Sequence, residues 1–355
     1  MRKTSIALAI VLLLPIASHA TVTFVEVPQP EAFIQIAASI APLAGLVEEV
    51  GGPHVTTITL LPEGVDPHAA SLPVEAVTDA ENADLLVFTG HYPWEEDLAL
   101  QVDTPYITMD DENAMANYID FGARLSEIPG EHEELVLAQH EHDENPHAWW
   151  LLPSNAIAIA NTTRAAFDTI NGTYSNIWQQ NFERFVEDVN SFLDLVAEFE
   201  VEYGFSELRA VAVTPAEAYI AETFGIEIEA VLQIEEVLIS GAELLEVQYA
   251  IRSGEVSLIV GSDVARLQSG GQYAITLSND YGIAIAWWRA IFFEDLTDYI
   301  SLMTYNLGVL ATAIEGGGVA SDNSPVNFAL LGFAVILGIV ALVEAIVLVL
   351  KARSE

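Results

Sequence analysis

Two short proline-containing segments present histidine in a way that suits metal binding. The first, LPEGVDPHAASLP at 61–73, follows a β-branched run and places His68 directly after an Asp-Pro pair. The second is Asn-Pro-His at 145–147, which places His147 in the same local context. Proline fixes its own φ and keeps the preceding residue extended, so each histidine sits on a stiff loop. These features predict His68 and His147 as metal ligands.

Composition limits which ligands and partners are possible. The chain has no cysteine, so a metal site must use His, Asp, Glu and water, which points to zinc, manganese or a similar cation. Residues 21–326 hold 50 of the 52 acidic residues but only seven arginines and no lysine. This charge excludes nucleic acid and anionic lipid as partners. It favours either attraction of cations or an acidic surface that maintains solubility in salt.

The two ends of the chain predict export and anchoring. Residues 1–20 have a charged start, an apolar core and small final residues, as a secretory signal peptide does. Residues 327–350 are apolar except for Glu344 and are long enough to span a bilayer. A Gly/Ser/Asn linker at 316–326 precedes this span. The tail at 351–355 carries Lys351 and Arg353, which favours a cytoplasmic end and an extracellular binding domain on a single-pass, C-terminally anchored protein.

Between the ends, the pattern predicts an α/β protein with two lobes bridged by a long helix. Each lobe is expected to contain a mainly parallel four-stranded sheet, at 21–152 and 205–315, with linking helices at 153–204. Apolar residues from Trp178 to Phe199 recur at alternating spacings of four and three, as one face of a helix does. The expected strands are Phe33–Ala38, Val55–Leu61, Asp84–Thr89, Tyr106–Met109, Arg209–Val213, Glu227–Leu232, Ser257–Gly261 and Ile283–Trp287. The expected helices are Pro42–Val50, Pro73–Asn82, Glu112–Phe121, Pro153–Ile170, Pro215–Phe224, Ala242–Ser253, Val264–Tyr281 and Asp298–Ile314.

Five motifs in order make the chain resemble the zinc/manganese solute-binding proteins of ABC importers. They are SIAPLAGLVEEVGG (39–52), LPEGVDPH (61–68), ADLLVFTG (83–90), NPHAWWLLPSNAIAIA (145–160) and DYISLMTYN (298–306). The resemblance covers about residues 33–315. It implies two lobes joined by a rigid helix, a bound divalent metal as the transported ligand, and an ABC permease as partner.

The resemblance carries only half of the family's metal site onto this chain. The family's first two metal histidines match His68 and His147. Its third ligand, a histidine, is replaced by Thr214, and its fourth, an acid, falls near Trp288 and Arg289. Arg289 would oppose a cation if it points into the cleft, and is harmless if it points outward. Substitute ligands would come from Glu217, or from Glu294 or Asp295, and carboxylates would favour manganese over zinc.

The remaining histidines allow two interpretations each. His91 follows a predicted strand at the end where ligand sites of open sheets gather, so it is either an extra metal ligand or a loop histidine without a role. The segment at 131–147 adds His132, His140 and His142 among acids. It is either a weak ion-collecting loop or a solvated polar loop.

Three functions are compatible with this pattern. The first is a membrane-tethered receptor that captures zinc or manganese and delivers it to an ABC permease. The second is a surface adhesion or sensing protein with a degenerate metal site. The third is a metal-dependent hydrolase on His68 and His147. This hydrolase lacks a recognisable general base, so we expect a protein that is not an enzyme.

Overall fold

The structure is a computed structural model that describes residues 34–68, 70–129, 144–234, 237–239, 241–291, 296 and 298–316. The predicted signal peptide, the predicted span at 327–350 and the candidate ligands Glu294 and Asp295 lie outside these ranges, as do His132, His140 and His142. Within the described residues, no helix combines the length and apolar character needed to cross a membrane.

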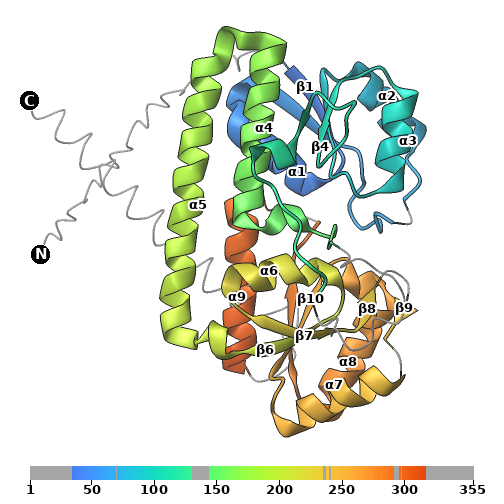
Figure 1. The fold of residues 1–355 in the computed structure, drawn as a ribbon, viewed down its shortest axis with the longest axis vertical. Helices are drawn as coiled ribbons and strands as arrows, with labels where there is room; N and C mark the ends of the chain where they lie inside the picture. The colour runs from blue at the N-terminus through green and yellow to red at the C-terminus, as the bar shows by residue number, and fades with distance from the viewer. Residues whose placement is uncertain are drawn as a thin grey trace, which may run out of the picture. The chain divides into compact units, whose positions relative to one another are not determined.

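The first lobe is built on a five-stranded parallel sheet with the order β2-β1-β3-β4-β5. Figure 1 labels β1 and β4 of this sheet, with helices α1, α2 and α3 around it. Parallel neighbours need crossover connections, and helices α1, α2 and α3 supply three of them. The strands are β1 (Ile34–Ala38), β2 (Val55–Thr59), β3 (Leu85–Val87), β4 (Tyr106–Thr108) and β5 (Ala116–Asn117), and the helices are α1 (Ala41–Gly51), α2 (Val74–Asn82) and α3 (Pro93–Gln101).

The second lobe repeats this winding on a four-stranded parallel sheet with the order β11-β10-β6-β7. A short antiparallel hairpin, formed by β8 and β9, follows β7 in the sequence. The strands are β6 (Arg209–Ala212), β7 (Glu227–Val231), β8 (Gln233–Ile234), β9 (Val237–Leu238), β10 (Leu258–Ser262) and β11 (Ala284–Trp288). The helices are α6 (Ala218–Phe224), α7 (Gly241–Ser253) and α8 (Ser269–Tyr281), with 3-10 turns η7 (Pro215–Glu217) and η8 (Ala265–Leu267).

The α/β class and the parallel sheets are confirmed, but several expected elements were wrong. The first sheet has five strands and not four. The helix expected at 112–121 is instead β5, which pairs with β4, followed by the 3-10 turn η2 (Tyr118–Phe121). The Asn117 side chain accepts the Asp111 N–H (2.9 Å) and donates to the Asp111 carbonyl oxygen (3.1 Å). Side chains that satisfy local donors in this way compete with helix formation. Helix α3 and the β8–β9 hairpin were not anticipated.

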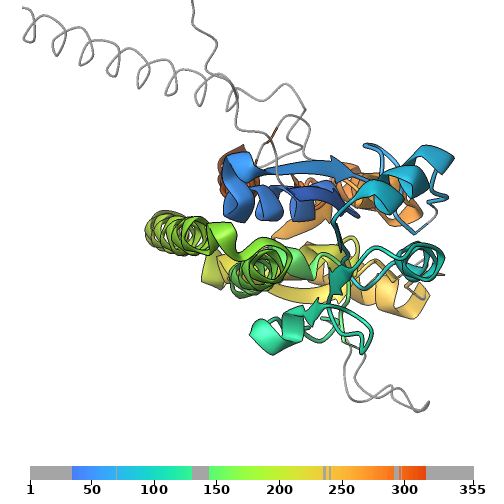
Figure 2. The same ribbon diagram turned by 90° about the horizontal axis from the view of Figure 1, so that it is seen from above.

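A long helix joins the two lobes, as the periodic apolar stripe predicted. Helix α5 (Ser175–Tyr203) packs against α4 (Pro153–Asn171) and α1, and also against α9 (Tyr299–Gly316), which covers β11 of the second sheet. Figure 2, seen from above, shows α4 and α5 side by side. The stripe residues Trp178, Phe185 and Val189 are fully buried, so burial of this face stabilises the helix in place.

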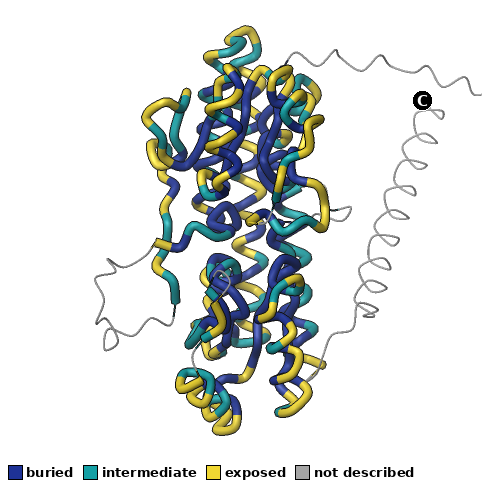
Figure 3. The backbone as a smooth tube through the Cα atoms, turned by 90° about the vertical axis from the view of Figure 1, so that its right-hand side faces the viewer, coloured by how far each residue is buried: buried dark blue, intermediate teal, exposed yellow. Residues whose placement is uncertain are grey.

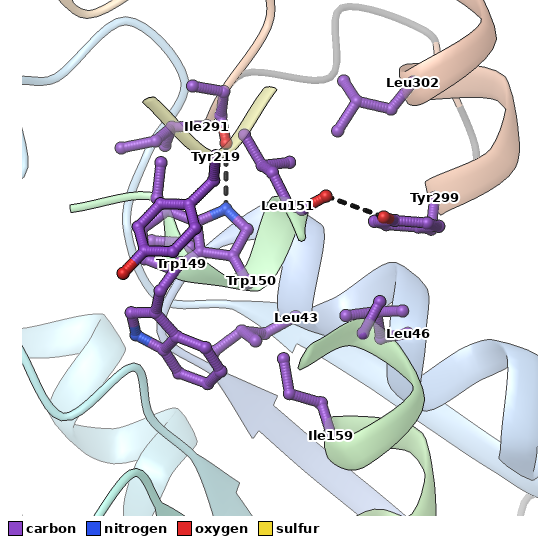
Figure 4. Close-up of a cluster of buried hydrophobic side chains, with 14 of the residues drawn as sticks. Leu43, Leu46, Trp149, Trp150, Leu151, Ile159, Tyr219, Ile291, Tyr299 and Leu302 are labelled. Carbon is purple, nitrogen blue, oxygen red and sulfur yellow. Dashed lines mark hydrogen bonds between the residues drawn. The ribbon is translucent and has the colours of Figure 1, made fainter. Parts of the chain in front are cut away.

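One hydrophobic core continues from the first sheet to one face of the second sheet. Figure 3 shows buried backbone in both lobes. Residues of β6 alternate accordingly: Ala210 and Ala212 belong to this shared core, whereas Val211 belongs to a separate core on the opposite face. The segment after His147 lies in the shared core, where the Trp150 indole donates to the Ala290 carbonyl oxygen at 3.0 Å (Figure 4). The motif histidine is therefore attached directly to a rigid part of the molecule.

Candidate metal centre

Strand order explains how histidines distant in sequence come together. His68 follows β2 and His91 follows β3, and these strands are the two neighbours of β1. The chain leaves β1 in one direction to reach β2 and then crosses to β3 on the other side, so the loops after β1 and β3 lead to opposite faces of the sheet and its switch point lies between these two strands at the carboxyl edge. His147 arrives beside His68 and His91 from the chain after β5. Open α/β sheets commonly bind their ligands at this position.

The three imidazoles form one cluster. Their ring centroids are separated by 4.9 Å for His68 and His91, 5.3 Å for His68 and His147, and 4.5 Å for His91 and His147. One ring nitrogen from each lies within 4.8 Å of the others. Three nitrogens bound to one zinc ion lie roughly 3.3 Å apart, so a modest contraction would complete a three-nitrogen metal site.

A buried carboxylate fixes the loop that carries His91. Glu95 is 2% exposed, and its oxygens accept the Thr89 N–H and hydroxyl, both at 2.8 Å, the Gly90 N–H at 2.9 Å and the His91 N–H at 3.2 Å. Gly90 has φ of 77°, and a Cβ there would meet the Thr108 hydroxyl oxygen at 2.7 Å. The tight turn and its carboxylate together set the direction of His91.

Asn145 determines which nitrogen of His147 is available to a metal. Its side-chain oxygen accepts the His147 backbone N–H at 3.0 Å and lies 3.1 Å from Nδ1 of the same residue. The Asn145 amide nitrogen donates to the Pro215 carbonyl oxygen at 2.8 Å, which fixes the orientation of the amide. An amide oxygen only accepts, so Nδ1 carries the proton and Nε2 keeps its lone pair for a cation.

His68 is the most exposed of the three histidines. Its backbone N–H donates to Asp66 Oδ1 at 2.9 Å, and the Trp94 indole donates to the Pro67 carbonyl oxygen at 3.0 Å. Its ring makes an edge contact with Tyr92 at 5.3 Å between centroids. The side chain of His68 is exposed, whereas His91 and His147 are half-buried. His68 is therefore the member of the cluster that faces solvent.

Burial keeps His91 and His147 uncharged and receptive to a cation. Burial, followed by the neighbouring His147 and His68, lowers the pKa of His91 to about 3. Burial and the neighbouring His68 lower the pKa of His147 to about 4. The buried Nε2 of His91 has no hydrogen-bond partner. A buried polar atom without a partner is costly, so this nitrogen is available as a metal ligand.

The carboxylate of Glu217 has a structural role in the second lobe. It accepts the Thr214 N–H at 2.6 Å and the Thr214 hydroxyl at 3.1 Å, which caps the turn η7. Glu217 is fully buried and lies outside the histidine cluster. Burial raises the pKa of Glu217 to about 7, against lowering by hydrogen bonds from Ser262 and Thr214. The structure therefore does not bring Glu217 to the other candidate ligands.

The other second-lobe positions are also engaged elsewhere. The Arg289 guanidinium lies over the Tyr305 ring, 5.7 Å from its centroid, and Trp288 is 1% exposed in the core. Asp263, which the sequence analysis did not single out, follows β10 and is buried. Its carboxylate accepts the backbone N–H groups of Val264 at 2.9 Å and Ala290 at 3.2 Å. Among the described residues, the cluster draws all of its histidines from the first lobe.

Two parallel α/β lobes, a long connecting helix and a ligand site at the carboxyl edge of a sheet define the class of solute-binding proteins. The chain matches a family model over residues 36–313, and it belongs to that family, the periplasmic component A of zinc-uptake complexes, ZnuA. The resemblance seen in the motifs is thereby confirmed. This is a family of metal-binding transport proteins, in agreement with the expectation that the chain is not an enzyme.

Individual relatives are distant in sequence. The manganese-binding lipoprotein MntA of Bacillus subtilis (strain 168) is 23% identical over 199 residues, which cover 55% of this chain and 60% of that protein. The chain thus matches only part of that relative. The solute-binding protein FpvC of Pseudomonas aeruginosa, solved with Mn2+, superposes with a TM-score of 0.65 at 18% identity, over 81% of this chain and 100% of FpvC. A periplasmic metal-binding protein of Candidatus Liberibacter asiaticus superposes with a TM-score of 0.62 at 18% sequence identity, over 79% of this chain and 99% of that protein.

Proposed function

We propose that the chain is an extracellular receptor that captures a divalent cation on His68, His91 and His147 and delivers it to an ABC permease. The observation that carries this proposal is the cluster itself: three ring nitrogens within 4.8 Å at the carboxyl edge of a parallel sheet. Family membership and the metal-bound state of FpvC support the same function. No second-lobe substitute for Thr214 is then required.

The ligand set favours zinc over manganese. Imidazole nitrogen suits zinc, whereas manganese prefers carboxylate and water oxygens. Three protein ligands leave one position of a tetrahedral zinc ion for water or another small ligand. We further propose that residues 327–350 anchor the receptor in the membrane after removal of 1–20, with 316–326 as the tether. The tether would keep the captured ion near the permease.

Calorimetric titration of the metal-free full chain in detergent, with Zn²⁺ and with Mn²⁺, tests this function. We expect one ion per chain, tighter binding of zinc, and a loss of affinity of about 100-fold or more for His68→Ala, His91→Ala or His147→Ala. This loss exceeds the roughly 10–100-fold effect of changing residues behind metal ligands.

His54→Ala is the matched control, because His54 stacks on Tyr174 at 4.6 Å outside the cluster. Unchanged affinity in His91→Ala would refute the three-histidine site. Absence of zinc and manganese binding in the unmodified chain would instead favour an adhesion or sensing protein with a degenerate site.

A further inference from the structure

Both motif histidines are held by the same local device. In Asp66-Pro67-His68 and Asn145-Pro146-His147, the Asp or Asn side chain accepts the backbone N–H of the histidine two residues later, at 2.9 and 3.0 Å. Proline between them has no N–H and restricts the backbone on both sides. Asp66 and Asn145 therefore fix the backbone position from which the His68 and His147 side chains extend.

Both of these side chains also contact the second lobe. The Asn145 amide donates to the Pro215 carbonyl oxygen at 2.8 Å, and the Tyr219 hydroxyl donates to the Asn145 carbonyl oxygen at 2.6 Å. On the other side, the Gln268 amide donates to Asp66 Oδ2 at 3.5 Å. Gln268 is oriented in turn by Gln233, whose amide nitrogen donates to the Gln268 side-chain oxygen at 3.2 Å. Neither contact places a second-lobe atom in the histidine cluster.

We infer that the second lobe controls metal affinity without ligating the metal, through Asp66 and Asn145 as positioning residues. This inference rests on the proposed function and adds a means of regulation at the same site. When Gln268 contacts Asp66, the His68 loop is held against the cluster. When that contact breaks, the His68 loop loses this support and His68 is positioned less well for the metal. Separation of the lobes at this contact thereby weakens metal binding.

The two contacts differ in strength, which identifies the mobile ligand. Asn145 is fully buried and makes two short hydrogen bonds to the second lobe, so His147 stays fixed. The Asp66–Gln268 contact is long and half-buried, and it is close to the limit of a hydrogen bond. His68 is also the ring farthest from the other two. We therefore expect the His68 loop to make the movement that brings the three ring nitrogens close enough to bind one zinc ion.

A charge-exchange experiment on the full chain in detergent tests this inference. The probe is Zn²⁺, and its dissociation rate is followed with a colorimetric chelator. Gln268→Ala removes the donor, and Gln268→Glu places a second carboxylate beside Asp66. We expect both to release zinc about 10–100-fold faster, as for residues behind metal ligands. The double variant Asp66→Asn with Gln268→Glu restores a donor–acceptor pair of reversed direction, and we expect it to regain most of the lost residence time.

The control is Gln272→Ala, an exposed glutamine in α8, the helix for which Gln268 is the N-cap. Urea unfolding of every variant distinguishes a positioning role from general destabilisation, since the inference requires faster release at unchanged stability. Release rates of Gln268→Ala and Gln268→Glu equal to the control, in a chain that binds zinc, would overturn this inference alone. Failure of the unmodified chain to bind zinc would overturn both the inference and the proposed function.

Discussion

Replacing Glu217 with glutamine should change how stability depends on pH and leave metal binding unchanged. The folded-state pKa of about 7 lies above the ordinary value of 4.5 because the carboxyl group is buried. The folded protein therefore holds a proton that the unfolded chain has lost between these pH values, so stability falls as pH rises through this window. One pKa unit corresponds to about 1.4 kcal/mol, so Glu217 should cost the unmodified protein roughly 3 kcal/mol of unfolding free energy between pH 4 and pH 8.

Glu217→Gln mimics the protonated carboxyl at every pH and should remove the contribution of Glu217 to the pH dependence. The loss of one acceptor for Thr214 should also lower the unfolding free energy by about 1–2 kcal/mol, by the same amount at every pH. Urea unfolding of the metal-free chain at pH 5 to 8 measures both effects, with the exposed Glu255→Gln as control. A parallel slope in wild type and variant would refute the reasoning. So would a tenfold or greater loss of zinc affinity, because Glu217 would then be a metal ligand.

Three further outcomes are expected. Trp150→Ala should lower the unfolding free energy by about 3–5 kcal/mol in urea titrations, because the buried indole packs in the shared core, whereas Trp150→Phe should cost less than half as much. Gly271→Ala should lower the melting temperature, since its Cβ would lie 2.3 Å from a backbone oxygen; Gly308→Ala, with open space around it, should raise it or leave it unchanged. The metal-free protein should lose stability as pH falls from about 6.5 towards 4, because the lowered pKa values of His91 and His147 make the unfolded chain bind more protons there. His91→Ala should reduce this acid sensitivity, and an unchanged pH profile would contradict it.

Much of the fold was predictable because its signals are local. The stripe from Trp178 to Phe199 depends on the period of a helix, and α5 follows it from Ser175 to Tyr203. The failure at 112–121 has a local cause as well, because the Asn117 side chain bonds the backbone of Asp111 and the segment pairs with β4. Composition alone does not reveal such side-chain hydrogen bonds. Strand β5 was therefore predicted as part of a helix, and the first sheet was given four strands instead of five.

The candidate site was predictable only in part. The Asp-Pro-His and Asn-Pro-His patterns identify His68 and His147 from sequence alone. The position of His91 after a predicted strand made it a candidate with two interpretations. Its place beside His68 depends on β2 and β3 being the neighbours of β1, and strand order is a non-local property that spacing along the chain does not contain. The same limit applies to Asn145, whose role depends on a carbonyl oxygen 70 residues away at Pro215. A polar residue immediately before Pro-His was the one available signal.

The late position of α9 in the chain has a consequence for the order of folding. Its first residue, Tyr299, donates its hydroxyl hydrogen to the Leu151 carbonyl oxygen at 2.7 Å, across a separation of 148 residues, and the helix packs on α5 and β11. Until α9 emerges, the apolar surfaces it will cover stay open to solvent. Contacts of such high sequence separation form slowly and join distant parts into one cooperative unit. A chain truncated before Tyr299 should therefore accumulate as an aggregation-prone intermediate, with both lobes partly formed and neither sealed.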